Sequence, residues 1–387
     1  MNPAAGVVRA RTLRLGEVTP VEAERWADLV DRALEPNPFL SPAYLLSASR
    51  WLARTTGIVL LVVERDDRMI ALLPLSRDER FHGTPLRYAT TAGTFLKDDA
   101  PLCAPLVDTE HAATALDHLL GHLADRRNGF PPLVELTLLP GDGALSDALH
   151  DACHRAGVPM LERSRFERAF LDRASDAPAP RDALSRSKRK QVERLIRRLE
   201  ESTGRPLVME DRGADPRAFE DFVALEASGW KGDVGQDGGA LDVTPGAVEW
   251  FTDVTDGLRD RKNLHLLTLV AGDEVVYMSM LLGAGGTLYS LMDTYDERFA
   301  KFSPGVIGRV MEQEFVLGST TADRFDPCLH PKNVGPSGLY RDRRTLVGVV
   351  LATRGLLPRL LVRSVPTLRR LRDRVVGTPR ETAEDAS

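Results

Sequence analysis

The stretch that most restricts how this chain can fold is residues 287–315, TLYSLMDTYDERFAKFSPGVIGRVMEQEF. Its first part, residues 287–295, is rich in aromatic, apolar and β-branched residues and directly follows a Gly-Ala-Gly-Gly turn, which predicts a strand. Because side chains alternate along a strand, one face of it is expected to carry Tyr289, Leu291, Asp293 and Tyr295.

A loop and a helix are predicted to follow this strand. The polar residues 296–302 lead to Ser303-Pro304-Gly305, after which helical spacing is kept by Val306, Ile307, Val310, Met311, Glu314 and Phe315. We expect Ser303 to cap the helix, Pro304 to take its first position and Gly305 to leave room for a ligand. A helix N-terminus without bulky side chains binds phosphate well, although an ordinary helix start is the simpler interpretation of the tripeptide alone.

Three separate segments carry a family resemblance. These segments are Trp230-Lys231-Gly232, the run from Tyr295 to Gly305, and Phe325-Asp326 with Lys332. Together they resemble the CelD-type, FemAB-like branch of the GNAT acyltransferases. The close match covers residues 184–332. The chain departs from the family at Phe325-Asp326-Pro327-Cys328, where a glycine-containing turn is usual, so the resemblance does not imply the shape of that loop.

The order of predicted elements repeats along the chain. Before residue 175 we expect strands at 7–15, 58–64, 69–76, 86–91 and 133–138, helices at 20–34, 42–53 and 111–126, and a loop at 97–104. After residue 182 we expect helices at 184–201, 216–227 and 245–259 and from Pro304 onward, with strands at 207–210, 264–270, 275–282, 287–295, 323–326 and, last, 346–352.

This order and the resemblance imply an α+β (mixed α/β) fold with two tandem GNAT-like lobes, each a mostly antiparallel mixed sheet flanked by helices. The expected parts are residues 1–175, a degenerate lobe on the acceptor side; 182–345, the acyltransferase lobe with the acyl-CoA site; and 346–387, a basic helical tail with a disordered end. Residues 175–181 are the expected linker. We expect one donor site, because Asp98 and Asp99 at the matching place of the first lobe would repel a pyrophosphate.

Composition excludes several classes of protein. A net charge of −5 over 387 residues argues against a general nucleic-acid binder, and no apolar run resembles a signal peptide or a membrane span, so we expect a cytoplasmic protein. The three cysteines are far apart and are expected to be free thiols. We expect no metal site, since His118 and His122 are four residues apart without the carboxylate of an HExxH motif.

The expected donor-binding residues surround the Ser-Pro-Gly tripeptide. They are Phe302, Ser303, Pro304, Gly305, Val306 and Gly308. Lys301 and Arg309 could add positive charge for the phosphates, and ordinary solvated positions explain them equally well.

The candidate catalytic residues are Asp293, Lys231, Lys332 and Glu226, and the candidate substrate-binding residues are Trp230, Tyr295 and Asp326. Asp293 could act as a base if its aromatic neighbours raise its pKa, although a carboxylate that bonds loop amides is the simpler interpretation. Lys231 could bind an acidic acceptor or the donor phosphates. Glu226 and Lys332 could equally be ordinary surface residues.

Two basic segments stand out. The helix at 184–201 carries seven Lys and Arg residues on one face, and packing between the lobes explains it better than RNA binding, because no aromatic residues are interleaved for base stacking. From Arg341 to Arg374 there are ten Arg against two Asp among many Leu and Val residues. This tail could contact an anionic membrane, but we expect it to pack on the acidic body.

The function that the resemblance implies is a GNAT family N-acetyltransferase, or more broadly an acyl-CoA-dependent acyltransferase. It would move an acyl group, acetyl in the simplest case, to an amine or hydroxyl of a small molecule or of a cell-envelope or exopolysaccharide precursor. Because no nucleophile with a paired base is recognisable, we expect direct attack on the held donor. The alternatives are a FemAB-like aminoacyl-tRNA-dependent transferase, which the lack of an evident inserted coiled-coil arm disfavours, and a non-catalytic two-lobe scaffold in polysaccharide synthesis. We expect no DNA partner.

Overall fold

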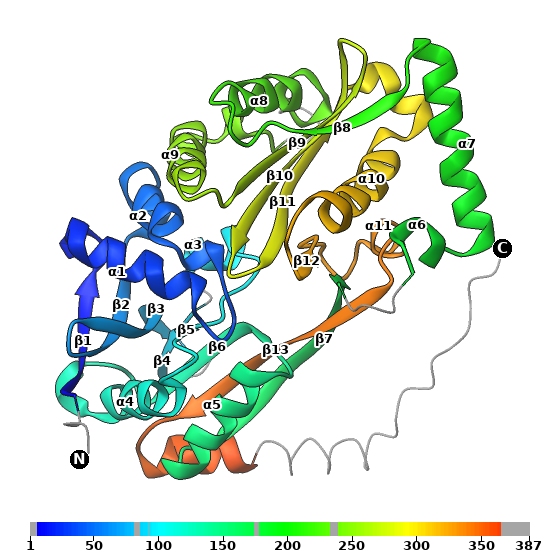
Figure 1. Cartoon of the computed structure of the whole chain (residues 1–387). Helices are drawn as coiled ribbons and strands as arrows, with labels where there is room; N and C mark the ends of the chain where they lie inside the picture. Colours follow the sequence, from blue (N-terminus) through cyan, green and yellow to red (C-terminus); the bar gives the residue numbers. More distant parts are fainter. Residues whose placement is uncertain (1–5, 81–85, 92, 174–177, 233–238, 365–387) are drawn as a thin grey trace, which may run out of the picture.

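The computed structural model of the chain describes residues 6–80, 86–91, 93–173, 178–232 and 239–364 (Figure 1). The N-terminal half contains β1 (Val8–Arg14), α1 (Pro20–Asp31), α2 (Pro42–Trp51), β2 (Ile58–Arg65), β3 (Arg68–Arg80), β4 (Arg87–Thr90), α3 (Thr94–Asp99), β5 (Leu106–Val107), α4 (Ala112–Ala124), β6 (Leu133–Pro140), α5 (Ala144–Arg155) and β7 (Met160–Asp172).

The C-terminal half repeats the strand-and-helix pattern. It contains α6 (Pro180–Ala183), α7 (Arg186–Thr203), β8 (Leu207–Asp211), α8 (Ala218–Ser228), η6 (Trp230–Gly232), α9 (Ala247–Asp260), β9 (Leu264–Ala271), β10 (Glu274–Ala284), β11 (Thr287–Tyr295), η9 (Glu297–Phe302), α10 (Pro304–Ser319), β12 (Arg324–Asp326), α11 (Val334–Ser337) and β13 (Asp342–Ala352). The expected strands and helices are therefore confirmed to within a few residues. The prediction of a loop at 97–104 is wrong for its first residues, because these form the end of α3. The sequence also did not predict α5 or β7.

The strands form a continuous mixed sheet in the order β1-β2-β3-β4-β6-β13-β7-β12-β11-β10-β9-β8, with β5 beside β3. The last strand of the chain, β13, returns to the first lobe and lies between β6 and β7, antiparallel to both. Figure 1 shows β7 and β13 as two long neighbouring strands that run from one lobe to the other. The expected boundary at residue 346 thus falls inside β13, and the tail begins only after Ala352.

The two lobes share a core where α2 packs against α9. The ring of Tyr44 lies 5.0 Å from that of Trp250, and the Trp250 indole donates a hydrogen bond of 3.1 Å to the Tyr44 carbonyl. Both side chains are fully or almost fully buried. Because such aromatic contacts pack two halves without freedom to slide, we expect the lobes to behave as one body.

A buried ion network also joins the lobes. Arg344 of β13 contacts Glu35 at 2.7 Å and Asp326 at 3.1 Å, and Asp326 contacts Arg168 of β7 at 2.6 Å. Asp326 has no exposed surface. Charges removed from water in this way must be paired, so the network fixes the positions of β12, β7 and β13.

The chain after β13 begins as a helix over residues 356–364. Val362 is buried and packs with Leu133, Val350 and Ala352, whereas Leu356, Leu357 and Leu360 are more than half exposed. The start of the tail therefore packs on the body, as expected, and also presents leucines to solvent. The described residues do not include the rest of the tail, from residue 365 onward, or residues 175–177 of the expected linker.

Candidate functional site

The site is built where two parallel strands part. β11 and β12 pair only from Thr287 to Tyr289 with Arg324 to Asp326. Beyond Tyr289, β11 continues to Tyr295. Among the described residues, no strand pairs with this part of β11 on the side where β12 lay. Backbone N–H and C=O groups on such an open edge are available to bind an extended ligand.

A cavity of about 280 Å³ lies at this end of β11. Its walls come from the end of α8, from η6, from β11 and from the start of α10. The lining residues are Glu226, Gly229, Lys231, Asp293, Thr294, Tyr295, Glu297, Gly305 and Arg309. The structure therefore brings together six of the residues singled out from the sequence: Glu226, Lys231, Asp293, Tyr295, Gly305 and Arg309.

Asp293 is held by two partners on the α10 side of the sheet. Its carboxylate contacts Arg309 at 2.6 Å and accepts a hydrogen bond of 3.2 Å from Tyr277. Burial, helped by the nearby Glu312 and Asp293 carboxylates, raises the pKa of Tyr277 well above its ordinary value, so its hydroxyl stays a donor. Asp293 thus faces the cavity as an ion-paired carboxylate.

The expected neighbours of Asp293 on the strand are partly wrong. A β-bulge at Leu291 interrupts the alternation, because Leu281 pairs with Ser290 while Met280 pairs with Met292. Tyr289 therefore turns to the opposite side, where its hydroxyl donates to the Pro36 carbonyl at 2.6 Å. A bulge shifts every later side chain to the other face, and short sequence runs give no sign of it.

Glu226 and Lys231 form a second polar pair in the cavity wall. The Lys231 ammonium donates to Glu226 at 3.1 Å and to the backbone carbonyl of Asp293 at 2.7 Å. The other Glu226 oxygen accepts from the backbone N–H of Leu241 at 3.0 Å. Glu226 is 3% exposed, so it is a buried, fully bonded carboxylate and not the surface residue of the simpler interpretation.

The Ser-Pro-Gly tripeptide begins α10, but Ser303 does not cap it as expected. Ser303 has the left-handed conformation (φ 55°, ψ 57°), and its side chain makes no capping bond. Its carbonyl instead accepts from the N–H groups of Val306 and Ile307 at 3.0 and 3.3 Å. The positive φ of a serine is strained, and it turns the chain sharply so that Gly305 faces the cavity.

The two glycines of this helix start have different tasks. A Cβ on Gly305 would meet Arg309 and Tyr295 only at 3.8 Å, so the fold tolerates one, and the open space beside it belongs to the cavity. A Cβ on Gly308 would lie 2.4 Å from the ring of Tyr277. Gly308 therefore allows α10 to pack closely on β10, and it does not line the cavity as a donor residue would.

Positive charge gathers at the same helix end. The ring of Phe302, which is 4% exposed, lies between the Arg198 guanidinium at 5.8 Å and the Lys301 ammonium at 4.9 Å from its centre. Arg198 belongs to α7, so the basic face of this helix comes beside η9 and the start of α10. Cations beside a helix N-terminus make this surface suitable for phosphates.

A buried acid that the sequence analysis missed lies behind the cavity. Glu312 of α10 is 1% exposed, and its carboxyl accepts a hydrogen bond of 3.0 Å from Ser290. Burial raises its pKa to about 7. Of the residues that kept the expected helical spacing, Met311, Glu314 and Phe315 are half-buried, whereas Glu312, Gln313 and Val316 are buried.

Other candidates lie away from the cavity. Asp326 belongs to the buried inter-lobe ion network, and Lys332 is exposed on the loop after β12. Three of the expected donor-binding residues pack beneath the helix start instead of lining the cavity: Phe302, Pro304 and Val306. Trp230 lies in η6, and its side chain is outside the described part of the structure.

Comparisons with known proteins agree with this geometry. A family model described as an acetyltransferase (GNAT) domain matches residues 186–311, which include α7, the cavity and the start of α10. No curated protein sequence matches the chain significantly.

Solved structures share the whole fold at low sequence identity. FemX aligns with a TM-score of 0.54 and 10% identity over 92% of this chain and 99% of its own. The C-terminal domain of a candidate lysylphosphatidylglycerol synthetase from Agrobacterium fabrum aligns with a TM-score of 0.50 and 10% identity over 89% of this chain and 95% of its own. A tandem GNAT protein from the clavulanic acid biosynthesis pathway aligns over 90% of this chain and 100% of its own, with 13% identity and a TM-score of 0.39.

The family match covers the domain that holds the cavity, and the structural similarity covers both lobes. Residues 186–311 therefore match an acetyltransferase (GNAT) domain, and the chain as a whole shares the two-lobed fold of FemX.

Proposed function

We propose that this protein is an acyltransferase that uses an acyl-CoA, acetyl-CoA in the simplest case, and passes the acyl group to an amine or hydroxyl. The observation that carries the proposal is the parting of β11 from β12 directly beside the glycine start of α10. This arrangement offers an open strand edge for an extended thioester and a helix end for its phosphates, within the segment that matches a GNAT domain.

The donor phosphates are proposed to bind at the start of α10. Gly305 leaves room for close approach, and Lys301 and Arg198 supply positive charge. The extended arm of the donor would lie along the open edge of β11, whose backbone groups can bond its amides. The thioester would then reach the cavity beside Asp293.

The chemistry in the cavity follows from the donor's reactivity. The acceptor's amine or hydroxyl attacks the thioester carbonyl, the acceptor loses a proton, and CoA leaves as the thiol or thiolate. Unpaired backbone N–H groups of the β11 edge are suited to stabilise the negative oxygen of the intermediate. No covalent enzyme intermediate is needed.

Asp293 and Lys231 are proposed to act on turnover. Asp293 lines the cavity, and Arg309 contacts its carboxylate at 2.6 Å, so Arg309 has to move aside or share the carboxylate before Asp293 can accept the acceptor's proton. Lys231 holds both Glu226 and the Asp293 carbonyl, so it positions the strand edge that faces the substrate. The acceptor is proposed to be a small amine or a saccharide precursor of the cell envelope.

Aminoacyl transfer from a charged tRNA is the second candidate. It is favoured by the similarity in fold to FemX and to a candidate lysylphosphatidylglycerol synthetase, whose name denotes a lysyl product. The basic face of α7 beside the donor end would then bind the acceptor stem of the tRNA.

A ligand screen separates the two candidates. Acetyl-CoA, a long-chain acyl-CoA and a charged tRNA are added in turn to the purified chain, and the melting midpoint is recorded, because a ligand of the folded state raises it. We expect a rise with an acyl-CoA. A rise with charged tRNA alone would overturn the acyl-CoA proposal and favour the second candidate.

A further inference from the structure

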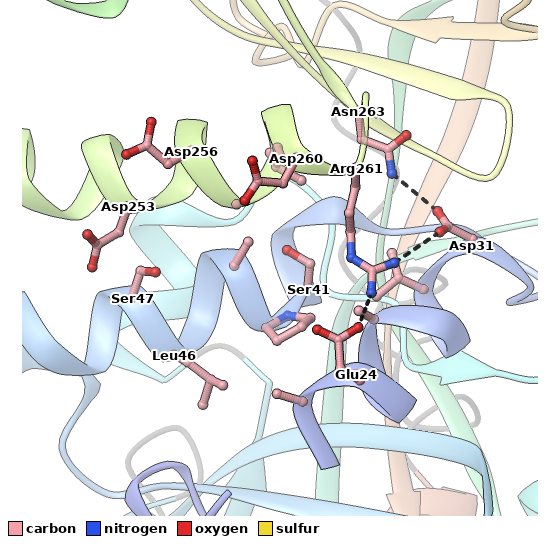
Figure 2. A pocket seen from close by; sticks show the side chains of 18 of the residues that line it. Glu24, Asp31, Ser41, Leu46, Ser47, Asp253, Asp256, Asp260, Arg261 and Asn263 are labelled. Atoms are coloured by element: carbon pink, nitrogen blue, oxygen red, sulfur yellow. Dashed lines mark hydrogen bonds and ion pairs between the residues drawn. The ribbon is translucent and has the colours of Figure 1, made fainter. Parts of the chain in front are cut away.

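A second and larger cavity, of about 500 Å³, lies between the two lobes (Figure 2). Its walls are α1 and α2 from the first lobe and α9 with the start of β9 from the second. The strand residue in its lining is Gly283 on β10, which pairs with Leu288 of β11. Asp293 lies five residues further along β11, or about 16 Å at the rise of a strand, so this cavity is separate from the proposed acyl-transfer cavity.

Negative charge dominates the rim of this inter-lobe cavity. Its lining includes Glu24, Asp31, Asp253, Asp256 and Asp260. Arg50 contacts Asp253 at 3.2 Å, Arg261 contacts Glu24 at 2.8 Å, and Arg259, outside the lining, contacts Asp256. Five carboxylates thus face three guanidinium groups, an excess of 5 − 3 = 2 negative charges, and Asp260 has no ion-pair partner among the described residues.

The aspartates are arranged along one side of one helix. Asp253, Asp256 and Asp260 follow the i, i+3, i+7 spacing of α9 and all line the cavity, and Figure 2 shows Asp253 and Asp260 on the side of the helix nearer to α2. Like charges three and four residues apart on a helix repel one another. A bound cation would relieve this repulsion.

A hydroxyl in the opposite wall is left without a partner. Ser47 of α2 is 4% exposed as a residue, its hydroxyl lines the cavity, and among the described residues no partner bonds that hydroxyl. Figure 2 shows it on the side of α2 that faces α9. Because this hydroxyl opens onto the cavity, it is suited to accept an N–H from a ligand there.

The rest of the lining is apolar and small. It includes Ala23, Ala27, Val30, Pro42, Ala43 and Leu46. A ligand that fits both surfaces has a hydrocarbon body and protonated amine groups. A bare metal ion does not fit, since the three aspartates extend along a helix and do not converge on a point.

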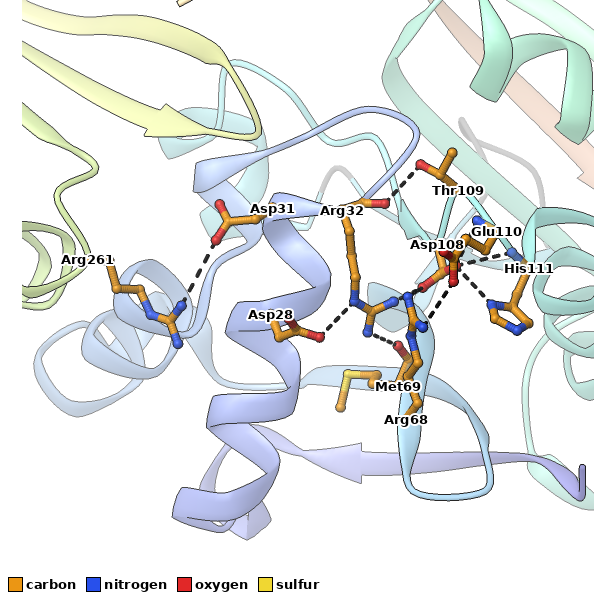
Figure 3. A network of polar contacts seen from close by, with 10 residues as sticks. All are labelled: Asp28, Asp31, Arg32, Arg68, Met69, Asp108, Thr109, Glu110, His111 and Arg261. Carbon is orange, nitrogen blue, oxygen red and sulfur yellow. Dashed lines mark hydrogen bonds and ion pairs between the residues drawn. The ribbon is translucent and has the colours of Figure 1, made fainter. Parts of the chain in front are cut away.

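Among the described residues, the possible metal-ligand atoms that do lie close together belong to Asp108, Glu110 and His111, outside this cavity. There, Asp108 is held by Arg68 at 3.0 Å and by Arg32, and its other oxygen accepts from the backbone N–H of Glu110 (Figure 3). Two guanidinium groups already neutralise this buried carboxylate, so it clamps α1 to the start of α4 and has no charge left for a metal.

We propose that the inter-lobe cavity binds an aliphatic polyamine, with Asp260 and the carboxylates of Glu24 and Asp31, which share Arg261, as counter-ions and the Ser47 hydroxyl as a hydrogen-bond acceptor. Because its walls come from both lobes, the bound polyamine bridges α2 and α9. The inference does not depend on the acyl-transfer proposal.

Isothermal titration of the full chain with spermidine tests this site. We expect saturable binding of one equivalent, and Asp260→Asn should weaken it about fivefold, because one exposed ion pair is lost. Ser47→Ala should weaken it about threefold through the lost hydrogen bond. Asp151→Asn on α5 is the matched control and should leave the affinity unchanged.

Three results would overturn the proposal. The first is no saturable heat with spermidine, and the second is equal affinity for Asp260→Asn and for Asp151→Asn, which would mean general attraction to an acidic surface. The third is equally tight competition by magnesium alone, which would assign the site to a metal. Since Asp260 is exposed and unpaired, Asp260→Asn keeps the test valid even if Ser47→Ala fails to fold.

Discussion

Asp293 on β11 and Arg309 on α10 meet at 2.6 Å in the wall of the cavity proposed for acyl transfer. About a quarter of the Asp293 side chain and about a fifth of the Arg309 side chain are exposed there. The pair joins the strand that would hold the thioester to the helix that would hold the phosphates. Any base action by Asp293 therefore involves Arg309 as well.

Replacing Asp293 by Asn tests whether this carboxylate acts in turnover. The change keeps the shape and removes the charge, so we expect kcat to fall at least about 100-fold, the usual size of a general-base effect. The donor Kd should change less than about threefold. Asp273→Asn, in the turn between β9 and β10, is the control. A normal kcat with a much weaker donor Kd would reduce Asp293 to a residue that positions Arg309.

Replacing Glu312 by Gln should change the pH dependence of stability. Burial raises the pKa of Glu312 from 4.5 to about 7, so the folded state keeps a proton that the unfolded chain loses. This group therefore lowers the free energy of unfolding as the pH rises from about 4.5 to about 7, by at most about 3 kcal/mol.

We accordingly expect Glu312→Gln to be more stable than the wild type at pH 8, with a much smaller difference at pH 5. Urea unfolding at both pH values measures this, and Glu210→Gln on the exposed side of β8 is the control. An equal difference at both pH values would mean that Glu312 is ionised in the fold throughout this range.

Replacing Arg344 by Met tests the role of the inter-lobe ion network. The side chain is 9% exposed and pairs with Glu35 and Asp326, so its loss leaves two buried carboxylates short of a partner. We expect a loss of about 3 kcal/mol in urea unfolding, with donor binding retained by the folded protein. Arg343→Met, at an exposed neighbour, should cost much less.

The opposite result would favour the sequence-based expectation that Asp326 binds the substrate. If Arg344→Met left stability unchanged and abolished donor or acceptor binding, Asp326 would belong to the substrate site. Asp326 was singled out because Phe325-Asp326 with Lys332 carries part of the family resemblance, and sequence alone does not show which arginines the fold brings to Asp326.

The start of the tail offers a test of where it packs. Val362 is 3% exposed in a small cluster with Leu133 and Val350, so Val362→Ala should cost about 2 kcal/mol in unfolding. Leu357→Ala, at a 75% exposed position, should cost nearly nothing. If instead Val362→Ala has no effect and Leu357→Ala weakens binding to anionic vesicles, the tail lies on a membrane. None of the described helices is both long and apolar enough to cross a bilayer.

The local elements and the cavity region were predictable because their signals are short in range. Helical spacing, the Pro-Gly start and the β-rich run around Asp293 each depend on a few neighbouring residues. The same signals, with the resemblance, led to Glu226, Lys231 and Gly305, which the fold brings into one cavity.

The rest depends on contacts between distant segments. The bulge at Leu291 reverses the side of Tyr289, and β13 inserts beside β7 from the far end of the chain. Neither leaves a local pattern, since a bulge is one extra residue and a long-range strand pairing has no fixed spacing. Glu312 was missed for a related reason, because a carboxylate on an apolar helix looks exposed until its burial is known.

The central claim is that the donor binds at the start of α10, and Gly305→Val tests it most directly. A Cβ at Gly305 meets no atom closer than 3.8 Å, so the variant is expected to fold with a nearly unchanged melting midpoint. Gly318→Val, near the end of the same helix and with no atom within 4 Å of a new Cβ, is the matched control.

Titration calorimetry with acetyl-CoA and with free CoA is then compared for the wild type and both variants. We predict saturable binding to the wild type and to Gly318→Val, and a loss of at least about 100-fold in affinity for Gly305→Val, because added methyl groups occupy the space that the donor needs. Equal affinity of Gly305→Val and the wild type for acetyl-CoA would contradict the account and place the donor elsewhere.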